Sequence, residues 1–419
     1  MNSELHGDTR KVRLDKAVAP TLPLKRTLLR ARRRTDELFR LVRPESLYER
    51  PVPERHRMVF YLGHLEAFDW NQIGAGALGM TAIHPDLDRL FAFGIDPPQG
   101  QLPADQASDW PSLKEIYAYN RRVRDNLDRV LDEAPEEIMQ VAIEHRLMHA
   151  ETFSYILHNL SPDRKRVPAA QPPTEWPAPV HRMIEIPPGV VTLGRERHAG
   201  FGWDNEFAGH TVGVPSFVIA KYKVTNAQYL EFVRAGAAAP HLWIQDRGEW
   251  RIRTMFGEIP LPLHWPAYVT HTEAQAYAQW VGKSLPTEAQ FHRAAYGTLN
   301  GEESSYPWGN TPPHESRGNF DFARWDPIPV SASPGGDSAF GVSQLVGNGW
   351  EWTSTVFHPF PGFELFSFYP GYSAQFFGGG HFVLKGGSAR TAACLLRRSF
   401  RNWFRPDYRY AYAGFRCVE

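Results

Sequence analysis

Two histidines stand four residues apart in the segment AIEHRLMHAETF, which spans residues 142–153. The segment has helical periodicity, and residues four apart on a helix point to the same side. His145 and His149 are therefore placed to bind one metal ion through their imidazole nitrogens. Two packed or solvated helix residues would show the same spacing, because the chain contains 17 histidines.

A third ligand has to come from another helix. His64 lies within the apolar stretch VFYLGHLEAFDWNQI, and helical bundles build metal sites from inward-facing side chains on neighbouring helices. A hydrogen-bonded core histidine is the alternative. Together, His64, His145 and His149 would supply three neutral nitrogens and leave coordination positions open for substrate and dioxygen. Glu66 and Glu151 are candidates for orienting the imidazole N–H groups, with solvent-exposed glutamates as the alternative.

Four segments with helical periodicity must position these residues. They are predicted at about 24–42, 54–75, 112–132 and 135–160, and four helices of this length form a bundle. The arginine run at 30–34 is interpreted as a solvated helix face rather than an RNA-binding patch.

The character of the chain changes after about residue 165. The stretch SPDRKRVPAAQPPTEWPAPVH holds six prolines, which predict an extended linker. Beyond it, short segments alternate with loops, and the only sizeable helices predicted are at 225–236 and 270–285, each starting at a capping threonine. We therefore predict a flexible N-terminus (1–22), a helical domain (23–165), a proline-rich linker (166–180) and a loop-rich α+β domain (181–419).

Composition limits the partners and the compartment. Lys plus Arg and Asp plus Glu balance at 46 each, so no global field attracts nucleic acid or an anionic membrane. No run approaches the ~18 apolar residues that span a bilayer, and no signal-peptide core is present. The two cysteines, Cys394 and Cys417, exclude a disulfide framework and favour a reducing, cytoplasmic setting. We expect a monomer or homodimer that acts on small molecules.

The segment HRLMHAE resembles the H-x-x-x-H-x-E signature of the DinB-like metal-binding bundle in ergothioneine-type sulfoxide synthases, and His64 stands where their upstream histidine stands. The second half resembles the formylglycine-generating-enzyme/sulfatase-modifying-factor fold, which is C-type-lectin-like. Eight stretches carry this second resemblance in order: IEIPPGVVTLG, VTNAQYLEFV, AYAQWVGKSLPTEAQFHRAAYG, YPWGN, LVGNGWEWTST, VLKGGSA, SFRNWFRPDYRY and AGFRC. The resemblance covers about 60–419 and implies a multidomain α and α+β protein, with a DinB-like four-helix bundle first.

The resemblance implies a non-heme iron(II)- and O2-dependent oxygenase that joins a chalcogen atom to the imidazole of hercynine (N-α-trimethylhistidine). The three histidines carry over as iron ligands. Within RNWF, Asn402 and Trp403 carry over as contacts of the trimethylammonium group, which an aromatic face stabilises by about 1–2 kcal/mol when desolvated. A buried structural loop is the alternative for this motif. The chain lacks the closely spaced cysteine pair of formylglycine-generating enzymes, so fold similarity does not transfer their activity.

Three departures from the family pattern bear on the second substrate, the chalcogen donor. Met148 replaces the usual Gln beside the hercynine imidazole, Phe404 replaces the Asp that follows RNW in several members, and Tyr119–Asn120 replaces Tyr-Arg. Loss of these polar groups favours a donor recognised through hydroxyls, the selenosugar of the selenoneine synthase branch, over cysteine or γ-glutamylcysteine. Arginines that would instead provide a carboxylate clamp are Arg121, Arg122, Arg398, Arg401 and Arg405. The main donor-binding candidates are Phe404, Arg398 and Arg401.

The proton donor in this family is most often a tyrosine. Tyr408, Tyr410 and Tyr412 are the main candidates, and Tyr117 and Tyr119 are also eligible. Two other functional classes stay open: a zinc-dependent DinB-like thiol transferase or hydrolase, and a non-catalytic ligand-binding module.

Overall fold

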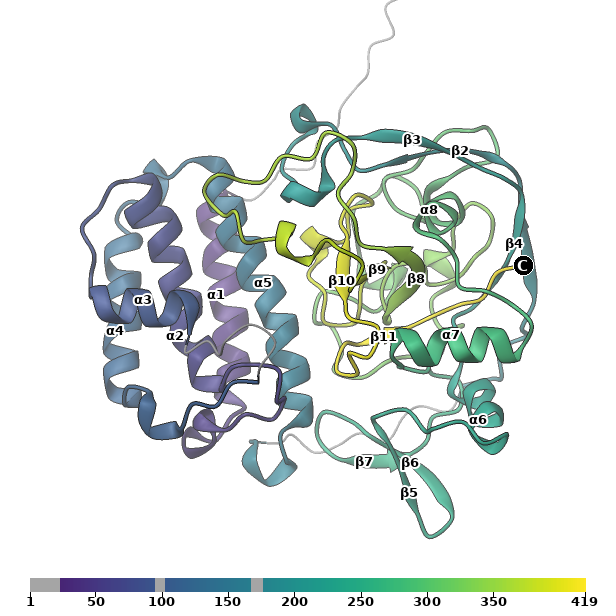
Figure 1. Cartoon of the computed structure of the whole chain (residues 1–419), viewed down its shortest axis with the longest axis horizontal. Coiled ribbons are helices and arrows are strands. Elements are labelled where there is room, and N and C mark those ends of the chain that lie inside the picture. The colour runs from purple at the N-terminus through teal and green to yellow at the C-terminus, as the bar shows by residue number, and fades with distance from the viewer. Residues whose placement is uncertain (1–22, 95–101, 167–175) are drawn as a thin grey trace, which may run out of the picture.

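The computed structural model describes residues 23–94, 102–166 and 176–419. The predicted flexible segment 1–22 and residues 167–175 of the predicted linker lie outside the described residues. Figure 1 shows two parts side by side, a bundle of helices and a loop-rich part with short strands. The predicted fold class, a helical domain followed by an α+β domain, is confirmed.

The helical part contains α1 (Leu24–Arg40), α2 (Met58–Asp69), α3 (Pro85–Phe93), α4 (Leu113–Leu127) and α5 (Glu136–Asn159). Helix α1 packs on α5, and α2 packs on α3, α4 and α5. All twelve residues of α2 are buried, including the polar His64, Glu66 and Asp69, and apolar residues occupy the remaining positions on every side of the helix. None of the helices in the described ranges combines the length and the apolar character needed to cross a membrane.

Two details of the bundle differ from the prediction. The helix predicted over 54–75 starts at Met58 and continues beyond Asp69 as a π-helical segment, Trp70–Ala77. Helix α3 is absent from the prediction because its nine residues offer little more than two turns of periodicity. It begins where His84 caps the backbone N–H of Leu87.

The C-terminal part is built from small sheets. β1 (Met183–Ile186) pairs with β4 (Phe217–Ala220), and β2 (Gly189–Leu193) pairs with β3 (His210–Val214). A three-stranded sheet contains β5 (Trp243–Asp246), β6 (Glu249–Arg253) and β7 (Glu258–Pro260). A four-stranded sheet has the order β10 (Asn402–Phe404), β9 (Phe382–Lys385), β8 (Trp350–Val356) and β11 (Ala413–Gly414).

Three helices accompany these sheets: α6 (Asn226–Arg234), α7 (His271–Trp280) and α8 (Glu288–Tyr296). The predicted threonine caps of α6 and α7 are confirmed, since Thr225 and Thr270 each close a capping box. The expectation of only two sizeable helices is wrong, because α8 is as long as α6 and is capped by Thr287 in the same way.

Helix α5 joins the two parts. In Figure 1 it is the helix of the bundle that faces β10 and the loops around it. Near its middle, the Glu144 carboxylate accepts hydrogen bonds from Arg397, at 2.6 and 3.0 Å, and from the Trp203 indole at 2.8 Å. Near its end, His158 is 3.2 Å from the Tyr412 hydroxyl. Buried, charge-assisted hydrogen bonds therefore fix α5 against the C-terminal domain.

The opposite side of α5 carries a buried ionic cluster. Arg146 is fully buried and donates to Glu66 at 3.0 Å, to Asp69 at 2.7 Å and to the backbone carbonyl of Leu65 at 2.8 Å. Removing one partner of a buried ion pair leaves the other charge without compensation. The cluster therefore ties α5 to α2 only while all of its members are present.

We predict that Arg146→Met lowers the free energy of unfolding by about 3–5 kcal/mol, because the buried carboxylates of Glu66 and Asp69 lose the arginine that bonds to both and keep only Arg124 and Arg32 as partners. Urea unfolding followed by circular dichroism measures the change. Arg234→Gln is the control, since Arg234 forms an exposed pair with Glu231 and should lose at most about 1 kcal/mol. A loss for Arg146→Met no larger than that of the control would show that the cluster does not hold the helices together.

Candidate metal centre

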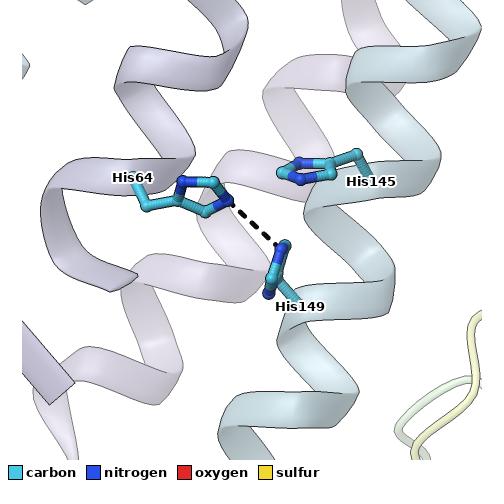
Figure 2. Close-up of side chains that lie close together, drawn as sticks. All are labelled: His64, His145 and His149. Carbon is cyan, nitrogen blue, oxygen red and sulfur yellow. Dashed lines mark hydrogen bonds between the residues drawn. The ribbon is translucent and has the colours of Figure 1, made fainter. Parts of the chain in front are cut away.

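Three histidine side chains meet between α2 and α5. Figure 2 shows His64 from α2 pointing toward His145 and His149, which lie one turn apart on α5. The ring centres are 4.5 to 5.1 Å apart, and one nitrogen from each ring lies within 4.8 Å of the others. The structure thus brings together the three residues predicted as metal ligands.

The hydrogen bonds of these rings leave several nitrogens without a partner. Nδ1 of His64 is 2.7 Å from the carbonyl oxygen of Phe91, and because a carbonyl only accepts, Nδ1 carries the hydrogen. The lone pair of His64 Nε2 is therefore directed inward, 3.3 Å from Nε2 of His149. Both nitrogens of His145 and Nδ1 of His149 are buried without a hydrogen-bond partner. Unpaired buried polar atoms are unfavourable, and a metal ion that accepts imidazole lone pairs fits this arrangement.

The surroundings keep the imidazoles neutral. Burial lowers the pKa of His64 to about 4 and lowers the pKa values of His145 and His149 well below the usual value. The neutral imidazole is the form that binds a metal ion. Aromatic rings support this environment: Phe68 stacks on His145 at 3.4 Å between ring centres, and Phe60 stacks on His64 at 4.6 Å.

The predicted orienting role of the two glutamates is corrected by the structure. The Glu66 carboxylate accepts hydrogen bonds from Arg124 and Arg146 instead. Glu151 accepts from the Trp350 indole at 2.8 Å, from Ser388 at 2.5 Å and from Thr391 at 2.7 Å. Within the described part of the chain, no hydrogen bond joins either carboxylate to the three imidazoles, and the backbone carbonyl of Phe91 orients His64.

A cavity of about 660 Å³ opens beside the histidines, between α5 and the C-terminal domain. One wall is a stripe of α5 at three- and four-residue spacing: His145, Met148, His149, Thr152 and Tyr155. The opposite wall includes the consecutive residues Asn402, Trp403 and Phe404. The predicted metal ligands on α5 and the predicted contacts of the trimethylammonium group thus line one cavity.

Trp403 forms an aromatic corner of this cavity. Its ring stacks on Phe357 at 4.3 Å and lies 5.4 Å from Tyr372 and 5.5 Å from Phe376. The side chain of neighbouring Asn402 accepts a hydrogen bond from the backbone N–H of Trp403 at 2.9 Å. Several aromatic faces around one space attract a cation, most strongly a poorly hydrated one.

The two arginines predicted to bind the donor are placed elsewhere. Arg401 is 2% exposed and pairs with Glu288 at 3.1 Å, and Arg398 pairs with Glu303 at 3.0 Å. Neither belongs to the described residues that line the cavity. Both guanidinium groups pair with carboxylates of the C-terminal domain, and this placement does not support the predicted donor-binding role.

The predicted tyrosines differ in their positions. Tyr408 and Tyr412 line the cavity, whereas Tyr410 is not part of its described lining. The Tyr408 hydroxyl accepts a hydrogen bond from Arg55 Nε at 3.0 Å, and the Tyr412 hydroxyl is bound to His158. Phe404 also lines the cavity and stacks on Tyr408 at 4.7 Å.

Two tyrosines absent from the prediction lie nearer to the histidines. The ring of Tyr369 is 6.1 Å from that of His145, and the Tyr372 hydroxyl is 3.6 Å from the sulfur of Met148. Both belong to the segment FHPFPGFELFSFYPGY, whose density of aromatic residues is the one sequence signal that points to them.

The comparisons with known proteins agree with this architecture. The family described as the DinB superfamily matches residues 27–158, and the sulfatase-modifying factor enzyme 1-like domain matches residues 168–419. A hercynine oxygenase of Mycolicibacterium thermoresistibile is 31% identical, with 96% of each chain covered. Another from Mycolicibacterium smegmatis is 34% identical over 74% of this chain and 78% of its own. Ergothioneine biosynthesis protein 1 of Neurospora crassa is 26% identical over 90% of this chain and 55% of its own.

The two domain matches cover the helical bundle and the C-terminal domain in this order, and the similarity to the first relative extends over nearly the whole of both chains. The chain therefore belongs to the hercynine oxygenase family.

Proposed function

We propose that this oxygenase binds Fe(II) at His64, His145 and His149 and joins the sulfur or selenium atom of a donor to the imidazole ring of hercynine. The observation that carries the proposal is the buried three-histidine cluster, whose unpaired nitrogens adjoin a cavity with an aromatic corner. The names of the relatives, hercynine oxygenase and ergothioneine biosynthesis protein 1, support this substrate and this reaction class.

The reaction balances without an external reductant. A thiol or selenol R–XH and the imidazole C–H each lose one hydrogen, and a C–X bond forms. One atom of O2 oxidises the chalcogen to a sulfoxide or selenoxide, and the other leaves as water with the two hydrogens. Iron(II) held by the histidines would activate O2 and bind the donor as a thiolate or selenolate.

The residues of the cavity have separate tasks in this proposal. Trp403, Tyr372 and Phe376 surround the trimethylammonium group, and Asn402 and Met148 position the rest of hercynine. Tyr369 replaces Tyr408, Tyr410 and Tyr412 as the preferred proton donor, because its ring lies beside His145. Burial raises the pKa of Tyr369 to about 12, so its hydroxyl keeps a proton to donate near neutral pH.

The preferred donor is a selenosugar, as in the selenoneine synthase branch. Met148 and Phe404 put uncharged side chains into the cavity at the positions where the family pattern has polar groups. The alternative in the same class is ergothioneine sulfoxide synthesis from cysteine or γ-glutamylcysteine. The zinc-dependent transferase and the binding module are separated from both by measuring metal content and oxygen uptake.

We predict that His149→Ala lowers iron occupancy far below one ion per chain and abolishes turnover, because the site loses one of three nitrogens. Metal analysis after anaerobic loading with Fe(II), and oxygen uptake with hercynine and a donor, measure the two effects. His198→Ala, at an exposed position of the C-terminal domain, should keep both properties. Zinc-loaded protein that turns over without consuming oxygen would remove the oxygenase assignment.

For the aromatic corner, Trp403→Ala should raise the KM for hercynine by roughly 10- to 30-fold, because a desolvated cation–π contact contributes about 2 kcal/mol. The KM for histidine, which lacks the three methyl groups, should change much less. Trp280→Ala is the control, since Trp280 is 48% exposed. An equal effect on hercynine and histidine would rule out recognition of the methylated ammonium group.

The donor is identified by the mass of the product. Aerobic incubation of the Fe(II)-loaded protein with hercynine and 1-selenoglucose is expected to give a selenium adduct faster than cysteine or γ-glutamylcysteine gives a sulfur adduct. Anaerobic samples should give neither product. Preference for γ-glutamylcysteine would assign the chain to the ergothioneine branch.

A further inference from the structure

Besides the aromatic corner at Trp403, the cavity has a polar corner, which is displaced from the histidines along the axis of α5. It is formed by Arg55, Tyr155 and Tyr408, all of which line the cavity. Tyr155 follows His149 by six residues on the helix, a distance of about 9 Å along its axis. Nothing in the proposed binding of iron or of the trimethylammonium group uses these three side chains.

The guanidinium group of Arg55 has unused hydrogen-bonding capacity. Its Nε donates to the Tyr408 hydroxyl at 3.0 Å, and its central carbon lies 5.6 Å from the ring centre of Tyr155 and 5.4 Å from that of Tyr408. Within the described ranges, no carboxylate lies at ion-pair distance from Arg55. The nearby Arg50 and Arg57, by contrast, both pair with Asp105. The two terminal amino groups of Arg55 are thus available to a ligand.

Tyr155 supplies an unsatisfied hydroxyl at the same corner. Its side chain is 3% exposed, and its hydroxyl makes no hydrogen bond of good geometry although Tyr408 is close. A buried hydroxyl without a partner is unfavourable by about 1–3 kcal/mol. Apart from the nearby Tyr408 hydroxyl, the Tyr155 hydroxyl is therefore available to a group that enters the cavity.

The chemistry of the corner selects the kind of group that fits it. The planar guanidinium group and the phenol hydroxyl can both donate hydrogen bonds to two neighbouring acceptor oxygens. A carboxylate or a pair of adjacent sugar hydroxyls provides such oxygens. A positive charge repels the trimethylammonium group, so hercynine is directed to the aromatic corner at Trp403. The second substrate is then the one that reaches from the histidines toward Arg55.

We propose that Arg55 and Tyr155 bind the oxygen-bearing end of the thiol or selenol donor while its chalcogen atom lies at the three histidines. This inference rests on the proposed function, since it assumes that the donor shares the cavity with hercynine. The shared recognition chemistry is a pair of acceptor oxygens, which belong to a carboxylate in an amino-acid donor and to hydroxyls in a sugar donor.

Calorimetry under argon tests the inference without turnover. Iron-loaded and metal-free proteins are titrated with 1-thioglucose, cysteine, cysteamine and hercynine. We expect Arg55→Met to weaken the binding of thioglucose or cysteine by roughly 10- to 100-fold, because a charge-assisted hydrogen bond is lost. Cysteamine, which has neither group, and hercynine should bind as before. Loss confined to cysteine identifies a carboxylate as the partner of Arg55, and loss confined to thioglucose identifies hydroxyls.

Three further variants make the result specific. Arg55→Lys keeps the positive charge but loses the paired N–H donors of the guanidinium group, so it should restore only part of the affinity that Arg55→Met loses. Tyr155→Phe removes one hydroxyl and should weaken the same probe several-fold, and it carries the test if Arg55→Met does not fold. Arg409→Met removes an exposed arginine outside the described lining of the cavity and should change nothing.

Two outcomes overturn the inference. One is unchanged affinity for thioglucose and cysteine in both Arg55→Met and Tyr155→Phe, and the other is an equal loss for hercynine and the donors. Either result leaves the proposed function intact if the wild-type protein binds hercynine and iron. Failure of the proposed function shows separately, as wild-type protein that binds neither.

Discussion

Helix α5 is held by both domains at once, and this constraint determines the geometry of the whole site. Glu144 and Glu151 are two turns apart, so they lie on one side of the helix, where Arg397, Trp350 and neighbouring groups bind them. His145 and His149 are displaced around the helix toward α2. Because both sides of α5 are bound, the helix cannot rotate and carry the two histidines away from α2 without breaking buried ion pairs or hydrogen bonds.

The packing of α2 against α5 also removes the three imidazoles from water. A buried imidazole nitrogen without a partner is unfavourable, yet the cluster contains three such atoms next to the apolar rings of Phe60 and Phe68. Elsewhere on α2 and α5, ion pairs with Arg146 and Arg397 compensate buried carboxylates. A group of three unpaired imidazole nitrogens that faces the same space is a local inconsistency typical of a functional site.

Some of this site can be predicted from sequence because it follows from helical periodicity. The four-residue spacing of His145 and His149, continued by three or four residues at a time, leads to Thr152 and Tyr155 on the same cavity wall. Tyr369 and Arg55 lie outside regular helices and strands. Their sequence neighbourhoods therefore show no hydrophobic periodicity, and the positions of their side chains depend on how the two domains pack. The partners of Glu66 and Glu151 also come from distant segments, so the predicted contacts of both with the histidines fail. The domain boundaries and the metal ligands themselves stay predictions.

The cavity has two chemically different corners, at Trp403 and at Arg55, and this difference bears on how an oxygenase could hold two substrates in one space. In the proposed function, two small and flexible substrates bind beside one metal ion, and each needs its own position. Aromatic faces at Trp403 attract a positive group, whereas the guanidinium of Arg55 repels it and attracts acceptor oxygens. The histidines lie beside the cavity that contains both corners. Under the two proposals, electrostatic complementarity therefore places hercynine at Trp403 and the donor at Arg55, because the exchanged arrangement would place a cation against a cation.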